Sequence, residues 1–157
     1  MDADDTRALR QLLHLRPVGA LGTLHGGDPA VSMVPFVLPA GATQLYIHVS
    51  TLAPHTRDMH GHPRVSLLVM AEPGADFPPQ ALPRVALAAE ARFLAPGDAD
   101  HASARSAYLA RFPDAATTFE LGDFSLVALQ PVAARLVAGF GRAQALVGDA
   151  LTAWLRG

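Results

Sequence analysis

Short apolar runs separated by tight turns fill the first half of this chain and restrict the folds open to it. Residues 18–24 and 30–38 are two such runs, and His25-Gly26-Gly27-Asp28 between them is typical of a β-hairpin turn. Six or seven strands are expected once the later β-tolerant runs are added, at 44–49, 64–70, 84–94, 124–129 and 134–140. Strands joined by short turns pair antiparallel, so the pattern predicts a mainly β (α+β) barrel or meander rather than a doubly wound parallel sheet.

Helices are expected at 5–15, 98–112 and 142–155, together with a short polar helix at 52–60. Gln130-Pro131 predicts a break between two strands, because proline cannot donate to a central ladder. The run 64–70 is almost continuously aliphatic, which predicts a strand buried on both faces. The apolar stripe of the last helix is expected to pack in the core or in a dimer; it consists of Leu146, Val147, Ala150, Leu151, Trp154 and Leu155.

Composition narrows the class of protein. A length of 157 residues predicts one domain, 1–157, with its own core. The N-terminus MDADDTRALR lacks the apolar segment of a secretory signal, and no apolar run reaches the ~20 residues of a membrane helix. A net charge of −2 gives no reason to expect nucleic acid, and the absence of cysteine excludes disulfides and thiolate chemistry. We expect a cytoplasmic protein without membrane or nucleic-acid partners.

All 12 basic residues are arginine. Without lysine the chain can form neither a Schiff base nor a P-loop. Any phosphate site must therefore use arginine, histidine, hydroxyl groups and backbone N–H groups.

Such a set gathers at the expected start of the helix at 52–60. Backbone N–H groups and the helix dipole make a helix start favourable for anions, and hydroxyl and guanidinium donors add to this. The candidate phosphate ligands are Ser50, Thr51, His55, Thr56 and Arg57. The alternative is an ordinary solvated helix start with serine or threonine as its cap.

Two further patterns leave alternatives open. His48, His55, His60 and His62 suggest a metal, but five residues separate His55 from His60, which turns them ~140° apart on a helix. No metal site is expected. Gly139-Phe140-Gly141 is either a strand end followed by a turn or a place where the backbone approaches a ring closely.

The order of several segments resembles the pyridoxamine 5′-phosphate oxidase-like FMN-binding split-barrel superfamily, and most closely its haem-utilisation (HugZ-type) branch. The segments that carry the resemblance are HVSTLAPHTRD at 48–58, HPRVSLL at 62–68, AYLARFP at 107–113, GDFSL at 122–126 and RLVAGFGRA at 135–143. The resemblance covers roughly residues 10–143.

The resemblance implies a six-stranded split barrel and a homodimer with FMN between its subunits. It matches Ser32, Met33, Val34 and Pro35 to the strand along the flavin ring. It matches Ser50, Thr51, His55, Thr56 and Arg57 to the phosphate site, and the segment with Phe140 and Arg142 to a strand near the ring. The family's lysines near the phosphate are absent here, where Pro54 and His55 occupy that region.

The expected function is thus an FMN-dependent oxidoreductase acting on a small molecule, with the flavin supplying the redox chemistry. No residue stands out as a catalytic acid or base. One alternative is a haem-binding or haem-degrading protein of the same fold. The other is a non-catalytic regulatory dimer that binds flavin or haem.

Overall fold

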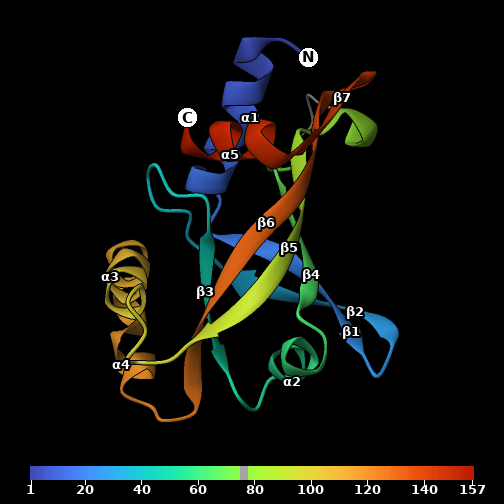
Figure 1. Cartoon of the computed structure of the whole chain (residues 1–157). Coiled ribbons are helices and arrows are strands. Elements are labelled where there is room, and N and C mark those ends of the chain that lie inside the picture. Colours follow the sequence, from blue (N-terminus) through green and yellow to red (C-terminus); the bar gives the residue numbers. More distant parts are fainter. Residues whose placement is uncertain (75–77) are drawn as a thin grey trace.

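A computed structural model describes residues 1–74 and 78–157 of the chain (Figure 1). The strands are β1 Val18–His25, β2 Asp28–Pro35, β3 Leu45–Ser50, β4 Arg64–Met70, β5 Arg84–Leu94, β6 Phe124–Gly139 and β7 Arg142–Val147. The helices are α1 Ala3–Leu15, α2 Pro54–Gly61, α3 His101–Arg111, α4 Ala116–Phe119 and α5 Gly148–Arg156, with 3-10 turns at Pro79–Ala81 and Pro113–Ala115.

The strands form one antiparallel sheet that curls into a split barrel. Its order is β2-β1-β4-β5-β6-β3, and β7 pairs with β6 outside this path. An isolated bridge between Val37 and Tyr46 joins the segment after β2 to β3 and brings the two ends of the path together. The prediction of an antiparallel barrel with flanking helices is confirmed.

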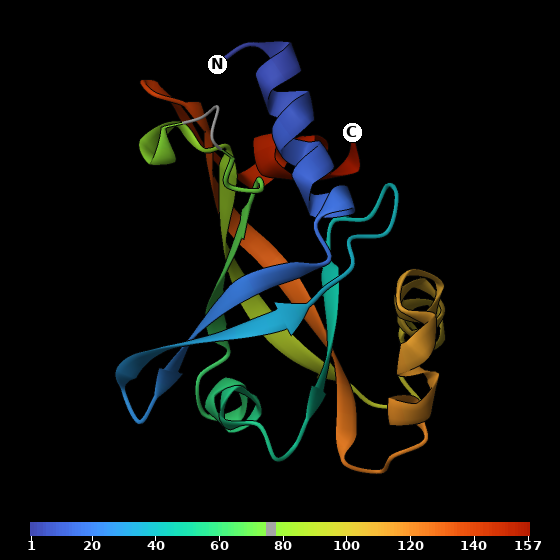
Figure 2. The ribbon, with the colours of Figure 1, turned by 180° about the vertical axis from the view of Figure 1, so that it is seen from behind.

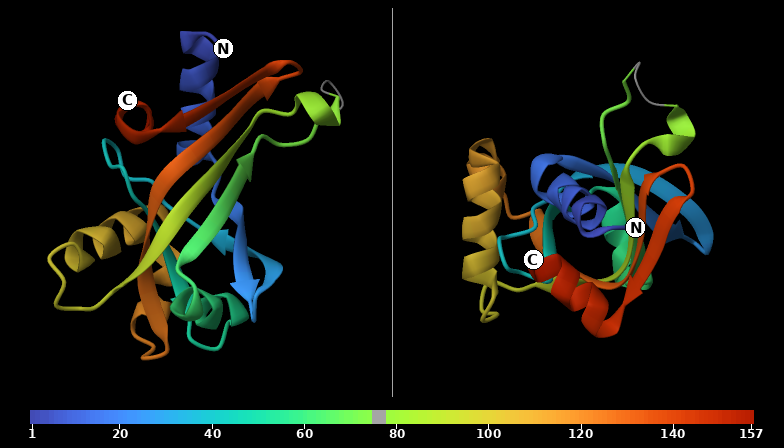
Figure 3. Two further views of the ribbon diagram at one scale, coloured as in Figure 1. Left: turned by 45° about the vertical axis from the view of Figure 1, so that its right-hand side comes forward. Right: turned by 90° about the horizontal axis from the view of Figure 1, so that it is seen from above.

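The helices close the ends and one side of the barrel. The N-terminal helix α1 and the C-terminal helix α5 lie over one end, and α2 lies at the other end beside the β1–β2 hairpin (Figures 1 and 2). A view along the barrel places α3 to one side of it (Figure 3). Large aliphatic side chains such as Leu21, Ile47, Leu67 and Leu136 fill the interior. Among the described residues, no helix covers one face of the strands β1, β4, β5, β6 and β7 (Figures 1 and 3).

The predicted break at Gln130-Pro131 is wrong, because β6 runs through it as one strand of 16 residues. The register against β5 shifts between Ala88 and Ala89, which is where Pro131 pairs. A bulge is one of the few places where a sheet tolerates proline, since the missing N–H falls where the ladder is already interrupted.

The predicted helix over 142–155 is also wrong in its first half. Residues 142–147 form β7, which pairs with β6 through a tight turn at Phe140-Gly141, and Gly141 adopts a φ of 72°. The helix begins only at Gly148. The sequence RAQALV has good helix propensity, but pairing with an open strand edge outweighs propensities of a few tenths of a kcal/mol per residue.

Of two burial predictions, the one for β4 is wrong and the one for the last helix is largely confirmed. Strand β4 is not buried on both faces, because exposure alternates along it and Met70 lies open to solvent. The stripe of the last helix is mostly used within the chain, where Leu146, Leu151 and Leu155 join the core, whereas Val147 is exposed.

Candidate functional site

The predicted phosphate site lies at the turn between β3 and α2, where most of its hydroxyl groups already have partners. The Thr56 hydroxyl, 1% exposed, donates to the Ser50 carbonyl at 2.6 Å. The Ser50 hydroxyl donates to an Asp123 carboxylate oxygen at 3.2 Å and accepts from the Leu52 N–H. The Thr51 N–H donates to the Asp123 carbonyl. These contacts hold the turn together, and the Asp123 carboxylate beside Ser50 would repel a phosphate.

Ser32 and His55 do come together across this turn. The Ser32 hydroxyl lies 3.0 Å from His55 Nδ1, so β2 and the first turn of α2 share a polar contact. Burial lowers the pKa of His55, and the nearby Asp58 carboxylate only partly offsets this. His55 therefore carries no positive charge near neutral pH, which limits its attraction for a phosphate.

The structure separates the remaining predicted residues. Arg57 lines a different cavity, beside the β1–β2 turn. Val34 points into the core, while its neighbour Met33 is 64% exposed and Pro35 is half-buried. Arg142 donates to Asp5 and to the Ala138 carbonyl, so it faces α1. Phe140 is 86% exposed at the tip of the β6–β7 hairpin.

The uncovered face of the sheet brings a different set of residues into rows. Cross-strand pairing runs from Met33 through Ala20, Leu68, Ala86 and Arg135 to Ala145. The neighbouring row runs from Met70 through Arg84 and Val137 to Ala143. Residues two apart on a strand share a face, so both rows point outward. The two rows together form an apolar floor, which is a surface of small and aliphatic side chains with two arginines, Arg84 and Arg135.

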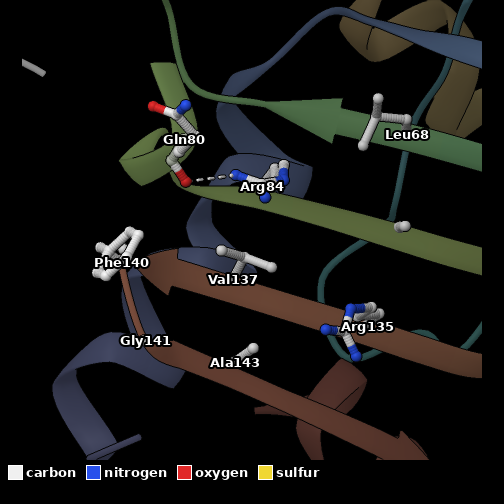
Figure 4. A pocket seen from close by; sticks show the side chains of 10 residues that line it. Leu68, Gln80, Arg84, Arg135, Val137, Phe140, Gly141 and Ala143 are labelled. Carbon is white, nitrogen blue, oxygen red and sulfur yellow. Dashed lines mark hydrogen bonds between the residues drawn. The ribbon is translucent and has the colours of Figure 1, made fainter. Parts of the chain in front are cut away.

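The upper end of this face is hollowed into a cavity of about 460 Å³ (Figure 4). Leu68, Val137 and Phe140 give it apolar walls, and Arg84 and Arg135 contribute guanidinium groups from the neighbouring strands β5 and β6. Arg84 is held in place by hydrogen bonds from Nη1 to the carbonyls of Gln80 and Leu82.

Neither arginine forms an ion pair with a carboxylate in residues 1–74 and 78–157. Two like charges on adjacent strands repel each other unless an anion lies between them. The cavity therefore suits a flat apolar molecule that carries acidic groups.

Sequence reasoning missed Arg84 and Arg135. A signal for them was present, because each is the one charged residue in an alternating outward pattern, Arg84-x-Ala86-x-Ala88 and Ala133-x-Arg135-x-Val137. It could be recognised only once the strand register placed these two patterns side by side.

Potential metal ligands do not cluster in the part of the chain that the structure describes. No group of three or more histidine, cysteine, aspartate or glutamate side chains there is arranged to hold a metal ion. Among the same residues, no helix has both the length and the apolar character needed to cross a membrane.

Comparison with known proteins places these features in a family. The family model for pyridoxamine 5′-phosphate oxidase matches residues 5–138. The chloroplastic haem oxygenase HOZ of Arabidopsis thaliana is 33% identical over 138 residues, which are 86% of this chain and 40% of that protein.

Two solved structures extend the comparison. A haem-binding protein from Mycobacterium smegmatis superposes with a TM-score of 0.83 at 32% identity, covering 98% of this chain and 62% of that one. HutZ, the haem storage protein of Vibrio cholerae, has a TM-score of 0.69 at 23% identity over 92% of this chain and 93% of its own, and supports the fold alone. This chain thus spans about two fifths to three fifths of the two relatives above 30% identity. The chain belongs to the pyridoxamine 5′-phosphate oxidase family and has its split-barrel fold, with relatives in the haem-utilisation branch.

Proposed function

We propose that this protein binds haem, with the cavity between β5, β6 and β7 holding part of the porphyrin. The observation that carries the proposal is the pair of arginines, Arg84 and Arg135, on an apolar floor. Haem is a flat apolar ring with two propionate carboxylates, so its chemistry matches this arrangement. The two relatives above 30% identity, a haem oxygenase and a haem-binding protein, support the same choice.

In this proposal the residues that line the cavity contact either the propionates or the ring of the haem. Arg84 and Arg135 would hold the propionates by charge-assisted hydrogen bonds, while Leu68, Val137 and Phe140 would cover apolar ring surface. Bound haem supplies redox-active iron, whose behaviour depends on its axial ligands. No histidine lines this cavity among the described residues, so we assign no axial ligand.

The test is a titration of the purified protein with haemin, followed by the Soret band. Arg84→Gln and Arg135→Gln should each weaken binding by roughly 3- to 10-fold, because each removes about 1 kcal/mol of a partly exposed charged contact. Arg64→Gln is the matched control, since Arg64 lies on β4 of the same sheet outside this cavity and pairs with Glu90.

The ligand offers a second control. A porphyrin dimethyl ester lacks the carboxylates, so it should bind wild type and the two variants with equal affinity. If wild-type protein does not change the Soret band of haemin, or if Arg64→Gln weakens binding as much as the cavity variants do, the proposal is wrong.

FMN remains the second candidate, supported by the contact between Ser32 and His55 on the strand and helix that the family resemblance matches to the flavin site. If FMN binds there, it should bind more tightly than riboflavin. Equal affinity for FMN and riboflavin would exclude a phosphate site.

We also propose that a second copy of the chain covers the uncovered sheet face. Met33, Met70 and Val31 are exposed apolar side chains on strands β2 and β4, and burying such surface stabilises by ~25 cal/mol per Å². Sedimentation with absorbance detection measures the oligomeric state and bound cofactor together. A monomer that sediments with full cofactor occupancy would contradict a shared site.

A further inference from the structure

An ion pair joins the N-terminal helix α1 to the β6–β7 hairpin, and both lie at the same end of the barrel (Figures 1 and 3). Arg142 Nη1 donates to Asp5 Oδ1 at 2.7 Å, and Arg142 Nη2 donates to the Ala138 carbonyl at 3.2 Å. The Asp5 side chain is 15% exposed, and its other carboxylate oxygen is buried without a hydrogen-bond partner among the described residues. The Asp5 carboxylate therefore depends on Arg142 for its side-chain contact.

The end of β6 provides the space for this arginine. A Cβ built on Gly139 would lie 2.9 Å from Arg142 Nη2 and 3.3 Å from Arg142 Nε, so a side chain at this position would displace the guanidinium. The register between β6 and β7 also shifts here, between Val137 and Gly139. Arg142 consequently faces α1, whereas its neighbours Phe140 and Gly141 line the cavity (Figure 4).

Other contacts already hold α1 in place. Its apolar side chains Leu9 and Leu13 are buried in the core. The Trp154 indole N–H of α5 donates to the Thr6 carbonyl at 2.9 Å, which ties the first turns of α1 to the C-terminal helix. The ion pair with Arg142 is thus an additional contact for a helix that the core fixes without it.

The hairpin has fewer contacts of its own. Among the described strands β7 pairs with β6 alone, and its first four residues, 142–145, are exposed. Phe140 at the tip is 86% exposed, so packing within the chain does not fix its position. The ion pair therefore restrains the hairpin against α1 rather than α1 against the hairpin.

We propose that Asp5 is a positioning residue for the haem cavity. Through Arg142 it restrains the β6–β7 hairpin, so that Phe140 and Gly141 stand at the rim of the cavity before the ligand arrives. A wall that is already ordered loses less conformational entropy on binding, so the ion pair raises affinity although Asp5 does not touch the ligand. This inference rests on the proposed haem function and extends it to a residue of α1.

The simpler view is that the ion pair contributes only to the stability of the fold. The Arg142 side chain is 53% exposed, and an ion pair open to solvent on one side stabilises a protein little. The two views differ in what they predict for the ligand. A purely structural pair leaves haem affinity unchanged, whereas a positioning pair changes it by way of Phe140.

Haemin titration followed by the Soret band tests this role. Asp5→Asn and Arg142→Gln should each weaken binding by roughly 3- to 10-fold, the effect of having to order a hairpin on binding. Asp4→Asn is the matched control, because Asp4 lies on the same helical turn but pairs with Arg7 and is 87% exposed. It should bind haemin as wild type does. Urea denaturation of each variant verifies that it is folded under the conditions of the titration.

A double-mutant cycle separates positioning from a general loss of structure. Phe140→Ala should itself weaken binding, because it removes apolar surface from the cavity wall. Adding Asp5→Asn to Phe140→Ala should cause little further loss, since Asp5 acts through the position of Phe140. If Asp5→Asn weakens binding by the same factor with and without Phe140, the positioning role is wrong.

The same titrations distinguish this inference from the proposed function. If Arg84→Gln and Arg135→Gln weaken haemin binding while Asp5→Asn and Arg142→Gln bind as wild type does, the haem cavity stands and the positioning role is refuted. If wild-type protein does not change the Soret band of haemin, both are refuted.

Discussion

Substitution by alanine should have opposite effects on stability at two glycines of β1, Gly19 and Gly22. A Cβ built on Gly19 would lie 2.8 Å from Leu67 Cδ1 and 3.1 Å from the Leu68 carbonyl oxygen. Leu67 is fully buried and Leu68 O belongs to the backbone of β4, so neither can move aside freely. Gly19→Ala should therefore overpack the barrel and destabilise it by about 1–3 kcal/mol. For a chain of this size that lowers the melting temperature by roughly 2–12 °C.

Gly22 lies three residues further along β1 and also faces β4. A Cβ built on it would contact only Ser66, with the nearest atom at 3.5 Å. Gly22→Ala should stabilise the protein by about 0.4–1 kcal/mol, because alanine reduces the freedom of the unfolded chain without strain in the folded one. Both variants are measured by urea denaturation and by thermal melting. If Gly19→Ala is as stable as wild type, or if the two variants shift in the same direction, the packing of β1 against β4 differs from the one described.

Three further outcomes are expected. Thr56→Val should cost about 1 kcal/mol in urea denaturation, because it removes the buried hydrogen bond to Ser50, whereas Thr56→Ser should cost less. Contacts in the folded protein lower the pKa of Asp58. Its carboxylate therefore stabilises the protein when the pH is above the pKa of the unfolded state, and this stabilisation is lost as the pH falls through the pKa of the folded state. Wild type and Asp58→Asn should consequently converge in stability toward pH 3. Burial lowers the pKa of His48 to about 4, so wild type should lose stability relative to His48→Phe as the pH falls from 6.5 toward 4, by about 1 kcal/mol once solvent screening of the half-exposed ring is allowed for.

The sheet could be predicted from the sequence where local signals and pairing agree. The β1–β2 hairpin is an example, since its turn carries Gly26 and Gly27 with positive φ. The prediction failed where pairing overrides local preference. Pro131 ends a strand by its own chemistry, yet it lies at a bulge here, and residues 142–147 have helix propensity but pair with β6.

For the candidate sites, too, residues close together in the sequence could be identified, but contacts between distant residues could not. The hydroxyl groups around α2 could be identified from their order in the chain, but their hydrogen-bond partners could not, because Asp123 is 73 residues away from Ser50. Arg57 follows His55 by two positions, which on a helix turns it to another side, so the two residues line different sites. Sequence neighbours are thus separated, while Arg84 and Arg135, 51 residues apart in the numbering, meet across one strand pair.

The choice between phosphate and carboxylate ligands rests on where unpaired positive charge lies. A phosphate dianion at the start of α2 would meet a neutral His55, hydroxyl groups with partners of their own, and the Asp123 carboxylate. Carboxylates at the β5–β6 cavity would meet two guanidinium groups, one of them already held by backbone carbonyls and so ordered before binding. Preorganised charge on an apolar floor favours an amphipathic acid over a compact, fully hydrated anion. Only the amphipathic acid also buries the apolar surface of Leu68, Val137 and Phe140.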